Sequence, residues 1–163
     1  VRRSLPMVIG TLVIAAVGYQ ESRLRQNARG ANGATGLMQM RASLAKQMKS
    51  GPVTALESNI EGGARYMNYL ADHLFGDSEP DQLNRSLIAA AAYNMGPATI
   101  RKARDKARAM GLDPNVWFDN LELAIITTAG LRPILYVRDI FKYYVAYKAE
   151  FALRDRLRGI PAD

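Results

Sequence analysis

The chain of 163 residues contains no cysteine and only one histidine, His73. Without cysteine it can form no disulfide, offer no thiolate metal ligand and use no cysteine nucleophile. A single histidine argues against a multi-histidine metal site and against a His-dependent triad, so we expect neither a metal nor another cofactor. His73 itself fits a surface position near the C-terminus of an expected helix.

Acidic residues are the scarcer charge, because 15 Asp and Glu face 22 Lys and Arg and leave a formal net charge of +7. Basic proteins favour polyanions such as nucleic acids, acidic glycans, cell-wall polymers or membrane surfaces. The densest basic run, Arg101 to Arg108, is most simply a solvated helix face or an electrostatic aid toward an anionic wall. We therefore expect no nucleic-acid binding, while peripheral association with a membrane or a wall stays open.

Long hydrophobic runs are also missing, and the longest, Pro6 to Val17, is too short to cross a membrane. Arg2 and Arg3 before it resemble the basic region of a signal peptide. The run nevertheless continues without a polar linker into Gly18 to Glu21. We therefore favour a buried helix of the domain itself, and the true targeting signal could lie outside this sequence.

Alternating hydrophobicity is nearly absent, whereas apolar residues recur at three- and four-residue intervals, as in amphipathic helices. The length fits one domain, and no repeat or linker divides it, so we expect a single all-α domain over residues 1–163. Ile125 to Thr128 could be a short extended piece. Helices are expected at about 6–26, 37–48, 56–75, 82–94, 97–110, 115–124 and 133–157, with a glycine-rich loop at 27–36.

Glu21, at the end of the apolar run, is the clearest candidate for chemistry. Burial among apolar groups raises the pKa of a carboxyl, which suits a proton donor near neutral pH. No further acidic residue follows until Glu57, whereas ordinary glycosidases use two carboxylates. A lone carboxylate fits a reaction in which the substrate supplies its own nucleophile. The simpler alternative is a surface glutamate at a helix end.

Five short motifs occur in order along the chain, and each alone would be weak. They are Tyr19-Gln20-Glu21-Ser22, Gly36-Leu37-Met38-Gln39-Met40, Asn59 to Tyr66, Ala91 to Pro97, and Tyr136-Val137 with Tyr143-Tyr144. Together they resemble the soluble lytic transglycosylase (SLT) domain over about residues 6–148, and most closely the membrane-bound lytic transglycosylase F-like branch. The resemblance implies a compact, goose-type lysozyme-like helical domain with a substrate groove.

The resemblance also implies an activity, the cleavage of the β-1,4 bond between N-acetylmuramic acid and N-acetylglucosamine in peptidoglycan. The cut would use no water and would leave a 1,6-anhydro end. Glu21 would protonate the leaving oxygen and then, as a carboxylate, take the proton of the sugar's 6-hydroxyl. Peptidoglycan strands would be the partner, the cell envelope or periplasm the location, and a monomer the expected state.

Other site residues follow from the same resemblance. It places Met38 and Gln39 along the glycan groove, Tyr93 and Asn94 beside the cleavage point, and Tyr136 over the site. The residues alone leave simpler alternatives open. Met38 could be a core methionine and Gln39 a solvated side chain on a helix face. Tyr93 and Asn94 could simply mark a helix terminus, and Tyr136 could be a core aromatic. Structural neighbours of the site are expected to be Ser22, Gly36 and Asn59.

Three positions depart from the family pattern. Gly30 stands where many relatives carry serine, Arg41 where proline is frequent, and Arg132 where a Glu-Thr pair is usual. The glutamate of this pair is missing, which suggests either that the site residues pair differently around Arg132 or that the site is weakened. Two other functions remain open: a goose-type lysozyme-like hydrolase, which needs an acidic residue to position water, and a non-catalytic peptidoglycan-binding module.

Overall fold

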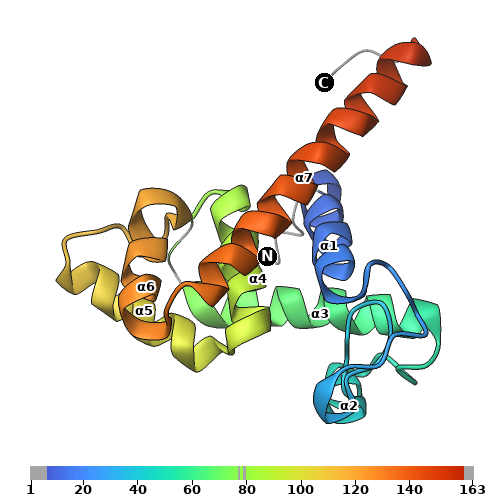
Figure 1. Cartoon of the computed structure of the whole chain (residues 1–163), viewed down its shortest axis with the longest axis horizontal. Helices are drawn as coiled ribbons and strands as arrows, with labels where there is room; N and C mark the ends of the chain where they lie inside the picture. The colour runs from blue at the N-terminus through green and yellow to red at the C-terminus, as the bar shows by residue number, and fades with distance from the viewer. Residues whose placement is uncertain (1–6, 77, 79, 160–163) are drawn as a thin grey trace.

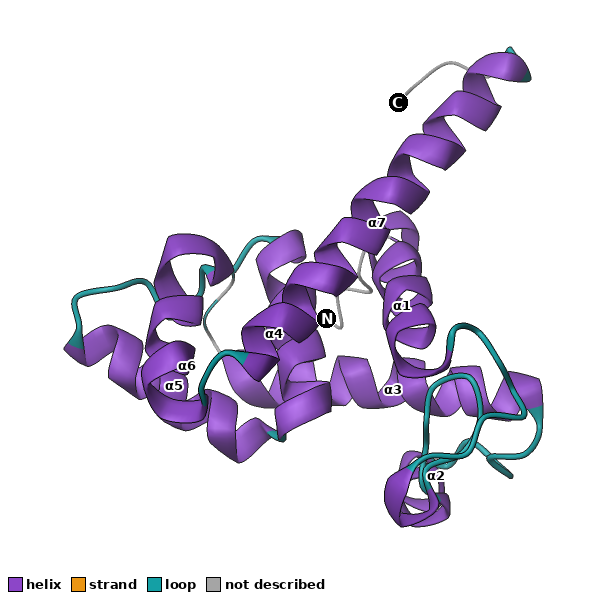
Figure 2. Ribbon diagram, in the orientation of Figure 1, coloured by secondary structure: helices purple, strands orange, loops and turns teal. Residues whose placement is uncertain are grey.

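The computed structural model describes residues 7–76, 78 and 80–159, so Pro6, expected in the first turn of the first helix, lies outside the described residues. Within them the fold is all-α, as expected, and only isolated bridges pair Thr35 with Arg29 and with Met40. Figure 2 shows helices joined by loops. The elements are α1 (Met7–Ser22), a 3-10 turn (Ala31–Gly33), α2 (Ala42–Met48), α3 (Leu56–Phe75), α4 (Gln82–Met95), α5 (Pro97–Ala109), a π-helical turn (Trp117–Leu121), α6 (Glu122–Ala129) and α7 (Arg132–Leu157).

Helix α4 forms the centre of the molecule. Residues 86–92 are buried, because α1, α3, α5 and α7 all pack against this helix. Its start is capped by Asp81, whose carboxylate accepts a hydrogen bond from the backbone N–H of Asn84 (3.1 Å). Its end is set by Gly96 at a φ of +84°, and Pro97 opens α5 directly afterwards.

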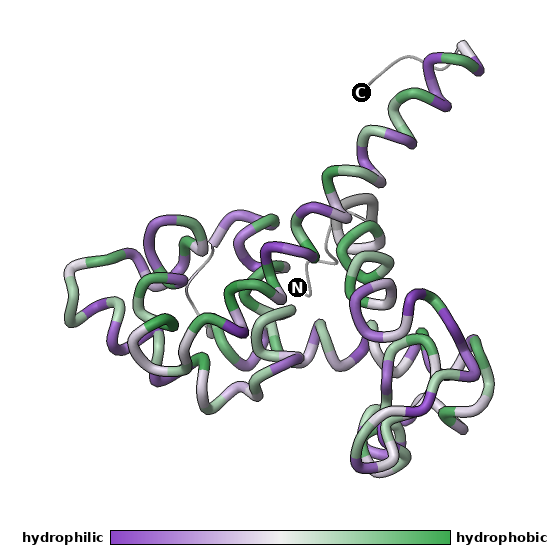
Figure 3. The backbone as a smooth tube through the Cα atoms, in the orientation of Figure 1, coloured by the Kyte–Doolittle hydropathy of each residue, from purple (hydrophilic) through white to green (hydrophobic). Residues whose placement is uncertain are grey.

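The remaining elements lie on either side of α4 (Figure 1). Helix α1 packs along α7, while α5 and α6 pair at the other end of the molecule. Residues 23–55, which we call the α2 lobe, consist of loops and α2 and lie beyond the end of α1. The C-terminal part of α7 projects past the body, and Figure 3 shows hydrophilic and hydrophobic residues alternating along it.

The apolar run near the N-terminus belongs to the core. Leu12, Val13, Ala16 and Val17 are buried in the same hydrophobic cluster as the centre of α4. This confirms the expectation of a buried helix for this part of the run. In the described part of the chain, no helix combines the length and hydrophobicity needed to span a membrane.

The helix expected over 37–48 begins only at Ala42, so this prediction was wrong for its first turn. Gly36 (φ +82°) and Gln39 (φ +49°) turn the chain, and Thr35 and Met40 exchange two backbone hydrogen bonds of 3.0 Å. The side chain of Asn59 on α3 holds this turn in place. Such a contact from a distant helix leaves no trace in local hydrophobic periodicity.

Two other boundaries were also wrong. Helix α1 ends at Ser22 rather than near residue 26, because Arg23 and Leu24 adopt left-handed conformations (φ +57° and +59°). The side chain of Arg23 also donates a hydrogen bond to the Tyr143 hydroxyl on α7 (2.9 Å). The helix expected at 115–124 is replaced by the π-helical turn and the start of α6. Ile125 to Thr128, which could have been extended, lie inside α6 with Ile125 packed in the core.

Candidate active site

Glu21 lies in the last turn of α1, only partly open to solvent. Its Oε1 atom accepts a hydrogen bond of 2.6 Å from the hydroxyl of Tyr136 on α7. Burial raises the pKa of Glu21 above its ordinary value, and the hydrogen bond from Tyr136 offsets part of that rise. The carboxyl is therefore suited to hold a proton at a pH where an exposed glutamate would be ionised.

Two tyrosines from other helices surround this carboxyl. Tyr136 is 9% exposed, and Tyr93 on α4 donates a hydrogen bond from its hydroxyl to the backbone carbonyl of Met38 (2.7 Å). Burial, and then the charge of Glu21, raise the pKa of both tyrosines. Both phenols therefore stay protonated and present neutral hydroxyl groups to the site. Helices α1, α4 and α7 thus meet at Glu21.

Ser22 joins the end of α1 to the α2 lobe. Its hydroxyl donates to the backbone carbonyl of Leu37 (2.8 Å) and accepts from the backbone N–H of Arg25 (3.0 Å). The side chain is buried, so these hydrogen bonds hold the end of α1 against the lobe.

Asn59 and Gly36 form the framework under the turn that carries Gln39. The fully buried Asn59 accepts from the backbone N–H of Met38 (2.7 Å) and donates to the carbonyls of Thr35 (2.8 Å) and Val53 (2.9 Å). A Cβ atom at Gly36 would come within 2.5 Å of Asn59, and its φ of +82° also favours glycine. Both residues are therefore structural, as their place in the motifs suggested.

Sequence reasoning missed Gln26. Its side chain accepts from the backbone N–H of Leu37 (3.0 Å) and donates to the carbonyl of Val53 (2.9 Å), so it joins two loop segments of the lobe. A glutamine next to the glycine-rich loop carries no periodic or motif signal, and only the folded contacts identify it.

An open cleft of about 350 Å³ lies beside this cluster, between α2, α3 and α4. Tyr93 forms one wall and connects the cleft to Glu21, since the Glu21 charge acts on the Tyr93 hydroxyl. Gln39, predicted to lie along the glycan groove, also lines the cleft, with its amide donating to the Gly36 carbonyl (2.9 Å). The lining residues are Gln39, Arg41, Ser43, Leu44, Gln47, Tyr66 and Tyr93.

Five of these lining residues were not foreseen: Arg41, Ser43, Leu44, Gln47 and Tyr66. Ser43 and Gln47 are four positions apart, and this spacing places them on one face of α2. The spacing could have indicated a polar face turned toward the groove.

Comparison with known proteins identifies the family. The sequence model of the Transglycosylase SLT domain matches residues 9–115, about two thirds of the chain. This chain belongs to the SLT family. The match confirms the resemblance that the five motifs indicated.

Curated proteins named membrane-bound lytic murein transglycosylase F are similar to this SLT domain. One from Shewanella woodyi is 37% identical over 144 residues, which is 80% of this chain and 30% of the relative. Others are 32% identical over 148 residues in Marinobacter nauticus (81% and 28%) and 35% identical over 154 residues in Desulfosudis oleivorans (86% and 34%). The chain thus spans about a third of the length of these relatives.

The prediction that the Met38 side chain lies along the groove was wrong. The Met38 side chain is 0% exposed and packs against Gly63, where a Cβ atom would come within 2.7 Å of it. It therefore cannot line the groove, and Met38 contributes through its backbone carbonyl, which holds Tyr93. Asn94 is exposed in the last turn of α4, and no hydrogen bond joins its side chain to the described residues, so its role stays a prediction.

Two departures from the family pattern now have a structural description. A Cβ atom at Gly30 would clash with Oε1 of Gln39, so a serine there would force the Gln39 side chain to move. Arg132 is the exposed first residue of α7, and within the described residues no carboxylate pairs with it. Rewired pairing through Arg132 is thus not seen, and Glu21 has Tyr136 as its partner instead.

Within residues 7–76, 78 and 80–159, no second carboxylate shifts the pKa of Glu21, which responds only to burial and to Tyr136. The same part of the chain contains no cluster of three or more His, Asp or Glu residues that could hold a metal.

His73 is exposed in the last turn of α3, as expected. The basic run on α5 is largely exposed, except that Arg104 is buried and donates to the backbone carbonyl of Pro114 (3.2 Å).

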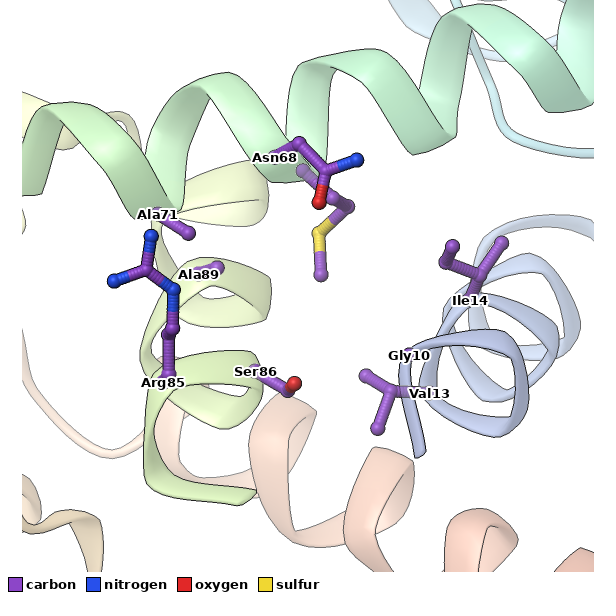
Figure 4. A pocket seen from close by; sticks show the side chains of 9 residues that line it. Gly10, Val13, Ile14, Asn68, Ala71, Arg85, Ser86 and Ala89 are labelled. Atoms are coloured by element: carbon purple, nitrogen blue, oxygen red, sulfur yellow. The ribbon is translucent and has the colours of Figure 1, made fainter. Parts of the chain in front are cut away.

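A second hollow lies between α1, α3 and α4 (Figure 4). Its volume is about 20 Å³, enough for roughly one water molecule. Its one cation, Arg85, is paired with Asp72 (2.7 Å), so this hollow offers no group for catalysis.

Proposed function

We propose that this SLT domain cleaves peptidoglycan strands without water, with Glu21 as its only acid and base. One observation carries the proposal: a partly buried carboxyl with a raised pKa, held by a single phenol and with no second carboxylate among its described neighbours. Ordinary hydrolysis of a glycosidic bond uses two carboxylates. A site with one suits a substrate that supplies both the charge stabilisation and the nucleophile.

The proposed reaction has two steps that return Glu21 to its starting state. Protonated Glu21 gives its proton to the glycosidic oxygen as the bond between that oxygen and C1 of the muramic acid breaks. The 2-acetamido group of the substrate stabilises the cationic C1. The 6-hydroxyl oxygen then bonds to C1 and releases its proton to the Glu21 carboxylate, so no water is consumed.

Tyr136 would steady the carboxylate between these steps. Its hydroxyl donates to Oε1, and such a bond favours the charged form of a carboxyl. Burial favours the neutral form instead. The two opposing influences would hold the pKa within reach of both proton transfers.

The relatives support the substrate and its location. Their name includes the words murein and membrane-bound, and the net charge of +7 favours an anionic polymer. We therefore propose peptidoglycan as substrate, the periplasm or cell envelope as location and peripheral association with the wall or membrane, with the domain acting as a monomer.

The test is a digest of purified cell wall with mass analysis of the products. Wild-type protein should release fragments with 1,6-anhydro ends, and Glu21→Gln should release none above background. Glu57→Gln is the matched control, because Glu57 is exposed in the first turn of α3. Reducing ends would identify a hydrolase, and wall binding without any product from wild-type protein would identify a binding module.

Loss of activity in Glu21→Gln supports the proposal only if the variant is folded, which its thermal unfolding checks. The folded pKa of Glu21 lies above 4.5, the ordinary value of a glutamate, so the stability that its protonated form contributes is present below pH 4.5 and is lost as pH rises through the folded pKa. The variant should therefore unfold at a temperature no lower than wild type at neutral pH. Any difference in unfolding temperature between the variant and wild type should vanish below about pH 4.5.

A further inference from the structure

Arg41, at the edge of the cleft, is an exposed cation without a partner. It directly precedes α2 and lines the cleft with Gln39 and Tyr66. No hydrogen bond or ion pair within the described residues involves its guanidinium. Several exposed arginines elsewhere do have partners, as Arg65 has in Glu61 (2.5 Å) and Arg154 in Glu150 (2.8 Å), although Arg132 at the start of α7 has no such carboxylate within the described residues.

The α2 lobe cannot supply the missing anion. From residue 22 to residue 56 the chain contains no Asp or Glu, so no local carboxylate competes for the cleft. The same stretch carries only positive charges, at Arg23, Arg25, Arg29, Arg41, Lys46 and Lys49. A cation in such a setting attracts an anion from outside the protein.

Tyr66 adds a hydroxyl group to the same cleft. Its ring lies 5.4 Å from that of Tyr93 and 6.2 Å from that of Tyr69. Tyr66 and Arg41 line the same cleft. Burial and the neighbouring Tyr69 raise the pKa of Tyr66, and the charge of Arg41 lowers it in part. The Tyr66 hydroxyl has no hydrogen-bond partner in the described part of the chain and is free to donate to a ligand.

A guanidinium and a phenol hydroxyl in one polar cleft are suited to a carboxylate. The guanidinium fork offers parallel N–H donors to the two oxygens, and the hydroxyl can donate a further bond. The cleft also leads to the reacting carboxyl, because Tyr93 is shared between the cleft and the surroundings of Glu21.

We propose that Arg41 and Tyr66 bind a carboxylate on the lactyl branch that muramic acid carries beside the cleaved bond. The inference rests on the proposed function. In peptide-free strands the lactyl group itself ends in a carboxylate, and in peptide-bearing strands the stem peptide provides carboxylates on the same branch. Arg41 is a specificity-determining residue here, since it selects the anionic branch without touching the reacting atoms.

Three glycan substrates test the proposal: peptide-bearing strands, peptide-free strands with lactyl carboxylates, and the same peptide-free strands with these groups converted to neutral methylamides. Arg41→Gln should raise KM about five- to twentyfold on at least one carboxylate-bearing substrate, as expected for losing one charge-assisted hydrogen bond, with kcat unchanged. Tyr66→Phe should raise KM by a smaller factor. On methylamide strands, wild type and Arg41→Gln should have the same KM.

Lys46→Gln is the matched control, because it removes one exposed charge from α2 without changing the lining of the cleft. Its KM should stay within about twofold of wild type on all three substrates, so that a general loss of attraction to the polymer is separated from local recognition. A KM effect confined to peptide-bearing strands assigns the site to the stem peptide, and one confined to peptide-free strands assigns it to the lactyl group.

Equal KM values for Arg41→Gln and wild type on both carboxylate-bearing substrates would overturn the proposal. An equal increase on the methylamide strands would do the same. Retention of Glu21→Gln protein on each strand type, with and without Arg41→Gln, measures recognition independently of cleavage. Absence of anhydro products from wild-type protein therefore refutes the proposed reaction alone, whereas absence of an Arg41 effect on retention and KM refutes only this inference.

Discussion

Asn59 provides a quantitative test of how the site is held in place. Asn59→Asp keeps the shape of the side chain and the bond accepted from Met38, but it removes the two bonds donated to the carbonyls of Thr35 and Val53 (2.8 and 2.9 Å). Each buried acceptor left without a donor costs about 1–3 kcal/mol. The variant should therefore lose about 2–6 kcal/mol of unfolding free energy, equivalent to a fall in Tm of roughly 5 °C or more.

The assay is thermal unfolding followed by circular dichroism, with Asn68→Asp as control. Asn68 lies exposed on the same helix, and its side chain makes no hydrogen bond within the described residues. The loss should shrink as the pH falls, because a protonated carboxyl can donate one of the two missing bonds. If Asn59→Asp unfolds within about 1 °C of Asn68→Asp at neutral pH, the reasoning about buried acceptors is refuted.

Two further predictions concern the acid and the cleft. Tyr136→Phe removes the bond that lowers the pKa of Glu21, so the alkaline limb of the pH–rate profile should move to higher pH, whereas Tyr144→Phe, also buried on α7, should leave it in place. A limb that stays, or moves to lower pH, contradicts this role. Gly30→Ser should displace the Gln39 side chain and raise KM for glycan strands, at a cost of about 1 kcal/mol in stability for the lost hydrogen bond; an unchanged KM would show that Gln39 does not contact the substrate.

The sequence predicted the long helices well and the short connections poorly. Helix α3 has the predicted bounds, and α4 and α7 differ from them by one residue, because apolar spacing and the flanking glycines and prolines are local signals. The turn at 35–40 depends on Asn59, and the π-helical turn at 117–121 includes Asp119 in a left-handed conformation. Neither cause can be found by reading hydrophobic periodicity along one segment.

The candidate site was predictable in its residue types and less so in their contacts. Glu21 was identified by its place at the end of an apolar run, and Tyr136 by a motif 115 positions later. Nothing in either segment shows that their side chains meet. Met38 was misplaced for the same reason, since its position in a groove motif does not reveal which of its atoms face the groove. Arg41 was visible only as a departure from the usual proline.

The convergence of three helices on Glu21 makes this carboxyl a sensor of tertiary packing. Its raised pKa requires burial against α4 and α7, which no isolated helix can provide. In a molten state that keeps its helices and loses their docking, the pKa of Glu21 would return to the ordinary glutamate value of about 4.5. Such a state would have native-like helical content and a fully ionised, inactive carboxylate at neutral pH, so the titration of one side chain distinguishes a packed molecule from a merely helical one.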